Sequence, residues 1–157
     1  MMTRRDMMKA LAAAGPTAIL AAEVMAGIAL AQQGAPTGKK ISGPGASDEG
    51  VTVRMVIEHE LPDAPGKQLS VVTVEFAPGA ASSPHRHPGS VVAYVLEGSV
   101  VSQVDPGQPV TYKTGQAWYE LPMHVHRVAR NPSKTRPAKI LAFLVSSKGQ
   151  ALTLPAT

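Results

Sequence analysis

The sequence contains no cysteine among its 157 residues. This absence excludes disulfides, cysteine-ligated zinc, iron–sulfur clusters and a cysteine nucleophile. Aromatic residues make up only 4% of the chain, so a folded core must be built from Val, Leu, Ile and Ala. The net charge of +4 is scattered, and no stretch interleaves basic and aromatic residues as nucleic-acid-binding surfaces do. We therefore expect no nucleic-acid partner, and a domain held together by its apolar core.

The N-terminal segment lacks a long, unbroken apolar run. Residues 10–31 are rich in Ala, Leu, Ile and Met but contain Glu23 and a Gly-Pro break, which makes them a poor membrane-spanning helix. The preceding residues read TRRDMMK and resemble a twin-arginine export signal, and residues 29–31 read ALA, a signal peptidase cleavage pattern. An ordinary Sec signal that happens to carry two arginines is the alternative.

This segment predicts that residues 1–31 form a signal peptide that is removed. The mature protein is then periplasmic or secreted, without stable membrane insertion after cleavage. Twin-arginine export carries folded proteins, often with a cofactor already inserted. A metal chosen in the cytoplasm could therefore be kept in a compartment where zinc and copper compete strongly.

Beyond residue 31 the composition changes twice. Residues 32–50 are rich in Gly, Pro, Ser, Ala and Lys and have no apolar period, which predicts a flexible leader. Over residues 51–157, short β-branched runs alternate with Gly and Pro turns, which predicts a single all-β domain, a sandwich or barrel. The expected strands span 51–58, 68–76, 91–96, 100–104, 110–112, 117–121, 126–129 and 140–146, with a further tail strand at 151–154.

Four of the five histidines lie in two His-x-His pairs, His85 with His87 and His124 with His126. Residues i and i+2 of a strand point to the same face, so each pair offers two imidazoles side by side. Imidazole is the commonest protein ligand for a transition metal. Two such pairs brought together predict a site for a divalent transition metal: Fe, Mn, Ni, Cu or Zn. A surface loop in which histidine is merely polar is the alternative for the first pair.

The residues around both pairs resemble the two sequence motifs of the cupin superfamily. Residues 79–98 read GAASSPHRHPGSVVAYVLEG and have the two glycines and the His-x-His of the first motif at the expected spacing. Residues 115–131 read GQAWYELPMHVHRVARN and match the second motif, which places a proline turn before a histidine and an asparagine. The resemblance implies a small, single-domain double-stranded β-helix, the cupin jelly-roll barrel. It also implies a homodimer, in which paired edge strands are not left exposed.

Two departures from the cupin motifs matter. The glutamate ligand of the first motif falls at Val91 or Val92, and neither side chain can bind a metal. Glu97 shares the strand face of Val91 but lies roughly 20 Å further along, too far to replace that ligand. The second departure is Met123, which stands where a glycine usually follows the motif proline. A metal is still expected, because the superfamily has a three-histidine branch that includes the thiol dioxygenases.

The resemblance assigns the metal ligands to His85, His87 and His126, since the histidine of the second motif precedes the asparagine by a few residues. His124 is a candidate fourth ligand. A hydrogen-bond partner of a ligand and an exposed turn residue are the alternatives for it. Glu120, just before the Leu-Pro turn, is a candidate catalytic residue that could support a ligand histidine or act as a base near the metal.

Neutral nitrogen ligands leave the full charge of a divalent cation in place. That charge favours an anionic or enolate-like substrate oxygen and the activation of water or dioxygen. The sequence therefore predicts a metal-dependent oxygenase, a cupin dioxygenase in type, that acts on a small phenolic, enol or related compound. The alternative is a non-catalytic periplasmic module that binds a small ligand or a metal, which the absence of an acidic ligand and of a secure base supports.

Overall fold

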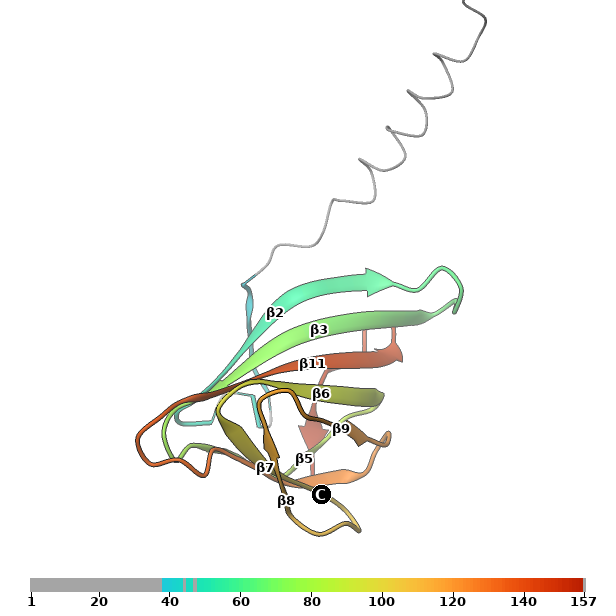
Figure 1. Ribbon diagram of the computed structural model, residues 1–157. Helices are drawn as coiled ribbons and strands as arrows, with labels where there is room; N and C mark the ends of the chain where they lie inside the picture. Colours follow the sequence, from blue (N-terminus) through green and yellow to red (C-terminus); the bar gives the residue numbers. More distant parts are fainter. Residues whose placement is uncertain (1–37, 44, 47, 157) are drawn as a thin grey trace, which may run out of the picture. The chain divides into compact units, whose positions relative to one another are not determined.

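The computed structural model describes residues 38–156 except residues 44 and 47 (Figure 1). The signal peptide expected over 1–31 lies outside the described residues. In the described part of the chain every helix or strand element is a strand, and the all-β fold expected from the sequence is confirmed. Across the same residues, no helix is long and apolar enough to cross a membrane.

The strands form two antiparallel sheets (Figure 1). The larger sheet has the order β1-β2-β3-β11-β6-β9. Its strands are β1 (Lys40–Ile41), β2 (Val51–Glu60), β3 (Lys67–Phe76), β6 (Ser90–Glu97), β9 (Ala117–Glu120) and β11 (Ala138–Ser147). The second sheet has the order β12-β5-β10-β7-β8, with β4 paired to β10. Its strands are β4 (Ala81–Ser82), β5 (His85–Arg86), β7 (Ser99–Val104), β8 (Val110–Lys113), β10 (Val125–Arg130) and β12 (Leu154–Pro155).

Eight of the nine expected strands correspond to β2, β3 and β6 to β11, with ends that shift by no more than two residues. The expected tail strand at 151–154 overlaps β12 only at Leu154. The two-residue strands β1, β4 and β5 were not expected. They have only two residues each, too few to show an alternation of apolar and polar residues.

The segment before β2 contacts the barrel where the structure describes it. β1 pairs with β2, and Ala46 is 3% exposed. The Asp48 carboxylate accepts hydrogen bonds from the backbone N–H of Ser83 and from its hydroxyl, the latter at 3.0 Å. The composition of residues 32–50 lacks an apolar period and therefore predicts a flexible leader. The contacts described here depend on backbone groups and single side chains, which leave no periodic pattern in the sequence.

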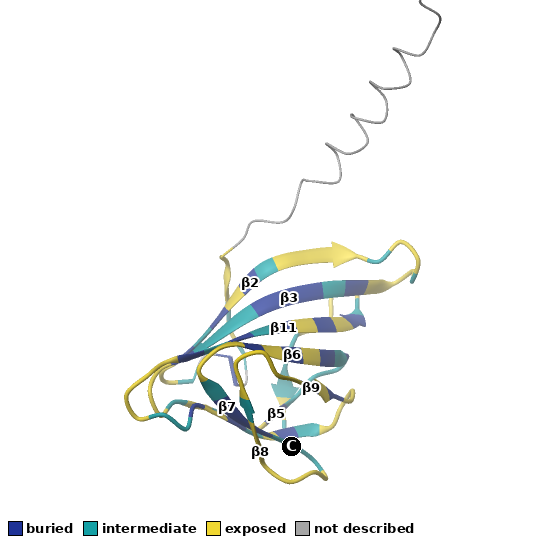
Figure 2. Ribbon diagram, viewed as in Figure 1, coloured by how far each residue is buried: buried dark blue, intermediate teal, exposed yellow. Residues whose placement is uncertain are grey.

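The core lies between the sheets and is mainly aliphatic, as the scarcity of aromatic residues predicts (Figure 2). From Val91 to Leu96 of β6 the odd-numbered residues are buried and the even-numbered ones face solvent, as in a half-buried strand; Val91 is 2% exposed and Val92 is 43% exposed. In β9 the pattern is the same with the opposite parity: Trp118 and Glu120 are buried and Tyr119 is exposed. This alternation aims Glu120 into the barrel.

The asparagine of the second motif holds the loops at one end of the barrel. Asn131 is 1% exposed, and its Nδ2 amide group donates to the carbonyl oxygens of Ala77 at 3.1 Å and Arg136 at 2.7 Å. Its Oδ1 accepts a hydrogen bond from the backbone N–H of Ser133 at 3.0 Å. The side chain thus ties the end of β10 to the residue that follows β3, and its role is structural.

Candidate metal centre

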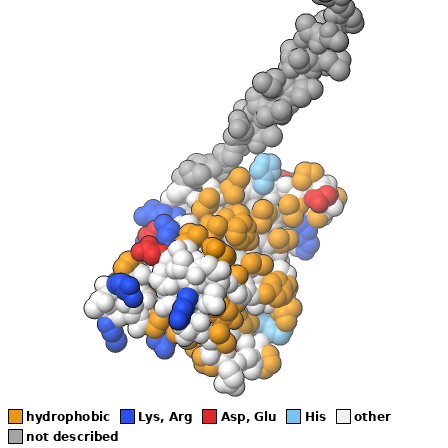
Figure 3. Space-filling view, viewed as in Figure 1, with side chains coloured by type: hydrophobic (Ala, Val, Ile, Leu, Met, Phe, Trp, Pro, Cys, Tyr) orange, Lys and Arg blue, Asp and Glu red, His pale blue; other side chains and the backbone are white. Residues whose placement is uncertain are grey.

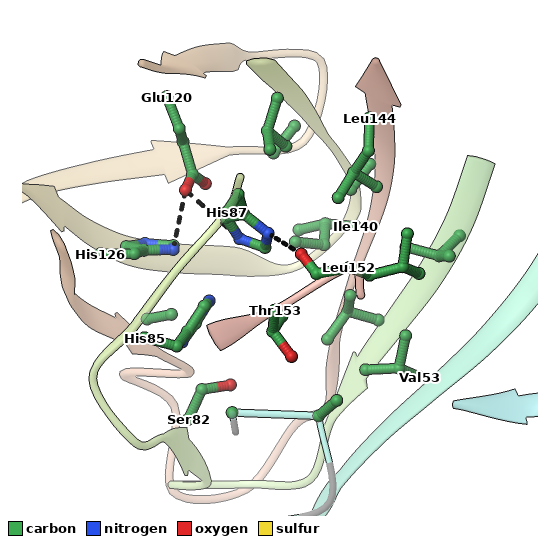
Figure 4. Close-up of a pocket in the computed structure, with 18 of the residues that line it drawn as sticks. Val53, Ser82, His85, His87, Glu120, His126, Ile140, Leu144, Leu152 and Thr153 are labelled. Atoms are coloured by element: carbon green, nitrogen blue, oxygen red, sulfur yellow. Dashed lines mark hydrogen bonds and ion pairs between the residues drawn. The ribbon is translucent and has the colours of Figure 1, made fainter. Parts of the chain in front are cut away.

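Three histidines meet inside the barrel (Figure 4). β5 carries His85, His87 follows two residues later, and β10 carries His126, the register partner of His85. One potential ligand nitrogen from each ring lies within 4.8 Å of the others. The ring centroid of His85 is 4.9 Å from that of His87 and 5.1 Å from that of His126. The structure thus brings together the three histidines that the cupin motifs assign as ligands.

Backbone carbonyls orient two of these rings. His85 Nδ1 lies 2.8 Å from the carbonyl oxygen of Ser83, and His87 Nδ1 lies 2.7 Å from that of Leu152. Because a carbonyl oxygen can only accept, each Nδ1 carries the hydrogen, and each Nε2 keeps its lone pair in the neutral ring. This arrangement of a ligand imidazole donating through its other nitrogen is the one that metal-binding histidines adopt.

His126 is oriented by a side chain instead. Its Nε2 lies 2.9 Å from Ser102 Oγ on the neighbouring strand β7, and both residues are buried. The hydroxyl can donate or accept, so it leaves open which ring nitrogen carries the hydrogen. Sequence reasoning did not find Ser102; the pairing of β7 with β10, which places it beside the ring, is not visible in the local pattern.

All three rings are held in their neutral form. Burial lowers the pKa of His85, and it lowers the pKa of His87 to about 4 and that of His126 to about 3. The neighbouring imidazoles lower the pKa of His87 and His126 further, because two charged rings would repel each other. At neutral pH each ring therefore keeps one nitrogen with a free lone pair, and no second proton competes with a cation for it.

Glu120 stands beside two of the histidines (Figure 4). Its Oε1 accepts a hydrogen bond from Trp118 Nε1 at 2.9 Å. Its Oε2 lies 3.2 Å from His126 Nδ1 and 3.6 Å from His87 Nε2, and makes no hydrogen bond with any described residue. Burial raises the pKa of this carboxyl to about 7, while the hydrogen bond from Trp118 acts in the opposite direction. The acid that the sequence singled out therefore lies at the centre of the site.

The structure does not bring His124 to this group. Its side chain is exposed, and its Nδ1 lies 2.8 Å from the carbonyl oxygen of Asp105. The pairing argument for a fourth ligand assumed that both histidines of the second pair share a strand. Met123 instead has a φ of +64°, the chain turns there, and β10 begins only at Val125. His124 is therefore an exposed residue next to a turn and not a member of the histidine cluster.

A cavity of about 60 Å³ adjoins the three histidines and Glu120. Apolar side chains, mostly from the larger sheet, form most of its wall, among them Val53, Ile140 and Leu144 (Figure 4). The segments before β2 and after β11 complete it. A Cβ on Gly45, which has a φ of +73°, would overlap the His85 ring, so only glycine fits there. The volume suits a metal ion with a few waters or one small ligand.

The donor set fits a divalent transition metal. Three neutral imidazoles offer nitrogen lone pairs, the kind of ligand that Zn, Cu, Fe and Ni accept. The unpaired carboxylate oxygen of Glu120 is buried next to them, where a polar atom without a partner costs free energy unless a cation or proton meets it. The evidence that a metal fits this site is therefore the chemical type of the three nitrogens and of Glu120 Oε2, together with their burial.

Comparison with known proteins agrees with the fold and the motifs. Residues 72–144 match the Cupin domain family model, and no curated protein matches the sequence. The structure is similar to an RmlC-like cupin from Shewanella frigidimarina, with a TM-score of 0.52 and 22% identity over 71% of this chain and 86% of that one. It is also similar to KdgF from Halomonas sp., with a TM-score of 0.51 and 22% identity over 70% and 86% of the two chains.

A third similar structure is the DMSP lyase DddQ from Ruegeria pomeroyi, with a TM-score of 0.57 and 14% identity over 74% of this chain and 60% of that one. At such identities the likeness concerns the fold, because one fold hosts many activities. The strand arrangement, the two motifs and these comparisons agree: the described part of the chain forms a single all-β domain with the cupin jelly-roll fold, and residues 72–144 of it match the Cupin domain family model.

Proposed function

We propose that the protein is an exported, metal-dependent cupin oxygenase that acts on a small phenolic, enol or related substrate. The observation that carries this proposal is the group of three buried imidazoles, each neutral and held by a hydrogen bond, beside a small apolar cavity. The proposed ligands are His85, His87 and His126, and the metal is one of Fe, Mn, Ni, Cu or Zn.

A divalent metal held by these rings would supply Lewis acidity and, if redox-active, the means to activate dioxygen. The chain provides the surroundings. Its neutral imidazoles leave the charge of the cation available to a phenolate or enolate oxygen. The aliphatic walls keep bulk water away from the reacting groups, which strengthens electrostatic attraction within the cavity. Glu120 is the one carboxylate among the described residues that line the cavity.

The size of the cavity supports a small substrate. At about 60 Å³ the cavity is far smaller than the roughly 300–1,000 Å³ pockets that hold drug-sized ligands, so it excludes a polymer or a large polycyclic ring system. Export by a twin-arginine signal, followed by life in the periplasm or outside the cell, is part of the proposal and rests on residues 1–31 alone. A protein exported in its folded form would carry its metal with it.

The test begins with the full chain, expressed in a host that has a twin-arginine pathway and purified without oxygen. Elemental analysis gives the bound metal, and an oxygen electrode follows uptake with catechols, small enols and thiols. Bound Fe, Mn, Ni or Cu with substrate-dependent uptake supports the oxygenase. Tightly held zinc without uptake supports the non-catalytic binding module. A protein that binds no metal, and whose His85→Ala variant unfolds at the same temperature as the parent, overturns both.

A further inference from the structure

Glu120 lies directly opposite Val91 in the antiparallel pair of β9 and β6. Both side chains are buried, 4% and 2% exposed, and both line the cavity. Directly opposite residues on one face of a sheet have their Cβ atoms about 4.5–5.5 Å apart. Val91 is a position at which the first cupin motif has its glutamate. The neighbouring strand thus brings a carboxylate to the place where the first motif lacks one.

At least one of the atoms around Glu120 Oε2 is an acceptor. His87 donates through Nδ1 to a carbonyl oxygen, so its Nε2, 3.6 Å from Oε2, has a bare lone pair. If His126 donates its Nε2 hydrogen to Ser102, then its Nδ1, 3.2 Å from Oε2, is bare as well. Acceptors that converge at such distances repel one another unless a proton or a cation lies among them. A divalent cation relieves all of these repulsions together.

Trp118 fixes which carboxylate oxygen faces the histidines. Its indole Nε1 donates to Oε1, and Trp118 itself is 7% exposed and packs against Tyr112. Oε1 is therefore engaged, and Oε2 is left without a hydrogen bond among the described residues. Glu120 is 4% exposed, so Oε2 faces the interior of the barrel and not bulk solvent. The carboxylate is held in a single orientation before any metal arrives.

We propose that Glu120 Oε2 is the fourth protein ligand of the metal, supplied by β9 in place of the glutamate that the first motif supplies from β6. This inference rests on the proposed metal site and makes its donor set three nitrogens and one oxygen. The carboxylate lowers the net charge of the centre, and an oxygen ligand favours Mn or Fe more than three imidazoles alone do. Glu120 then acts as a ligand rather than as a free base.

The test uses the full chain, made metal-free and titrated with Co²⁺. Calorimetry measures affinity, and the visible absorption of Co²⁺ reports its ligands and geometry. The variants are Glu120→Gln, which keeps an acceptor for Trp118, and the swap Val91→Glu with Glu120→Val, which moves the carboxylate to β6. His85→Ala is the control for loss of a histidine. Thermal unfolding of each metal-free variant shows whether it folds.

We expect Glu120→Gln to fold as the parent does, to bind Co²⁺ more than about 100-fold more weakly, and to give a different Co²⁺ spectrum. Loss of an outer-shell partner typically costs only about 10–100-fold. The swapped pair should recover much of the affinity. If the swapped variant does not fold, Glu120→Gln alone decides whether Glu120 is a ligand. If the swapped variant folds but recovers no Co²⁺ affinity, a carboxylate at position 91 does not replace one at position 120, and that part of the inference is overturned.

The outcomes separate this inference from the proposed function. If Glu120→Gln binds Co²⁺ as the parent does, or more weakly with an unchanged spectrum, Glu120 is not a ligand and the inference is overturned. The three-histidine site stands in that case, provided that His85→Ala loses binding. If the parent itself binds no Co²⁺, both the inference and the metal-dependent function fail.

Discussion

His85 and His126 are register partners across β5 and β10, and their ring centroids lie 5.1 Å apart. Strand pairing itself therefore builds the centre, because it sets two imidazoles from distant parts of the chain on one inner face. β5 has only two residues and is held between β10 and β12. The geometry of the site thus depends on short strands that pair in the correct register.

Replacement of a histidine in the centre should abolish tight metal binding. We expect His126→Ala to lower Co²⁺ affinity by more than about 100-fold, beyond the 10–100-fold range of outer-shell partners. His124→Ala is the matched control, because His124 lies two residues away with an exposed side chain. It should bind Co²⁺ as the parent does. Equal losses in the two variants would contradict the assignment of ligands.

Replacement of Gly45 should disturb the centre from the segment before β2. In Gly45→Ala the added Cβ overlaps the His85 ring, so the ring must move away from its carbonyl partner. We expect weaker Co²⁺ binding together with a lower melting temperature. Gly66→Ala has a matched backbone conformation, φ +79° against +73°, and nothing within 4 Å of the new Cβ. It should lose stability from backbone strain alone and keep its metal affinity.

Asn131→Ala should destabilise the fold without a direct effect on the metal. The change removes the donor to the carbonyl oxygen of the buried residue Phe76 and to those of Ala77 and Arg136, whose hydrogen bonds are partly buried. We expect a loss of roughly 2–4 kcal/mol in the free energy of unfolding, since each unsatisfied buried group costs about 1–3 kcal/mol. Urea unfolding measures it. Gln103→Ala removes an exposed amide–carbonyl hydrogen bond and should cost much less; a similar cost would show that Asn131 is not a structural anchor.

The metal-free protein should lose stability in acid. The pKa of His87 is about 4 and that of His126 about 3, both below the usual 6.5, so the unfolded chain takes up protons that the folded chain does not. The stability contributed by these groups is full above pH 6.5 and is lost as the pH falls through about 4 and then 3. Urea unfolding in the presence of a chelator, compared between pH 7 and pH 5, measures the loss.

Glu120 has the opposite effect on the pH dependence. Its pKa is raised from 4.5 to about 7, so between these values the folded chain keeps a proton that the unfolded chain has released. That contribution is present below pH 4.5 and is lost as the pH rises through 7. Glu120→Gln removes it, so the variant should lose more stability than the parent between pH 7 and pH 5. Identical slopes would contradict a carboxyl that is protonated in this range.

The homodimer implied by the resemblance to cupins remains a prediction, and the outer face of the larger sheet offers a surface for it (Figure 3). A row of apolar register partners crosses five strands there. The row consists of Ile57, Val71, Phe143, Val92 and Tyr119. All but Val71 are 37–52% exposed. We expect a second copy of the chain to cover this row, because an apolar row matches its own copy about a two-fold axis.

Sedimentation of Phe143→Glu tests that prediction. The new charge lies in the middle of the row, so a dimer should dissociate into monomers. Val110→Glu places the same charge on β8 of the other sheet, at a residue that is 46% exposed, and should leave the dimer intact. A parent chain that sediments as a monomer, or a dimer that both variants leave intact, would contradict this surface.

The two His-x-His pairs show how far local pattern carries. Both rings of the first pair reach the centre, although β5 ends at Arg86 and only His85 belongs to it. The second pair has the same spacing, yet only His126 reaches the centre, because the chain turns at Met123 and β10 begins only at Val125. The i, i+2 spacing alone therefore does not decide whether both rings meet; a left-handed residue next to the second pair redirects one of them.

Glu120 shows the limit of reasoning along one strand. On the strand that carries Val91, the only acid that shares its face is Glu97, which is too distant to replace the missing glutamate. The acid that lies beside the histidines comes from β9, the neighbour of β6. One local signal points to it: in β9, Trp118 and Glu120 are two residues apart and must share a face, and a tryptophan on that face favours burial of both.

The sequence by itself determined the strands, their aliphatic core and the kinds of ligand available, because periodicity and the absence of cysteine are properties of the chain. Tertiary structure decided which side chains meet. Imidazoles of β5 and β10 and the carboxyl of β9 converge only after β9 pairs with β6 and β10 pairs with β5. Such pairings join segments distant in sequence through backbone hydrogen bonds, which every residue can accept and every residue except proline can donate, so side-chain pattern alone does not specify the partner.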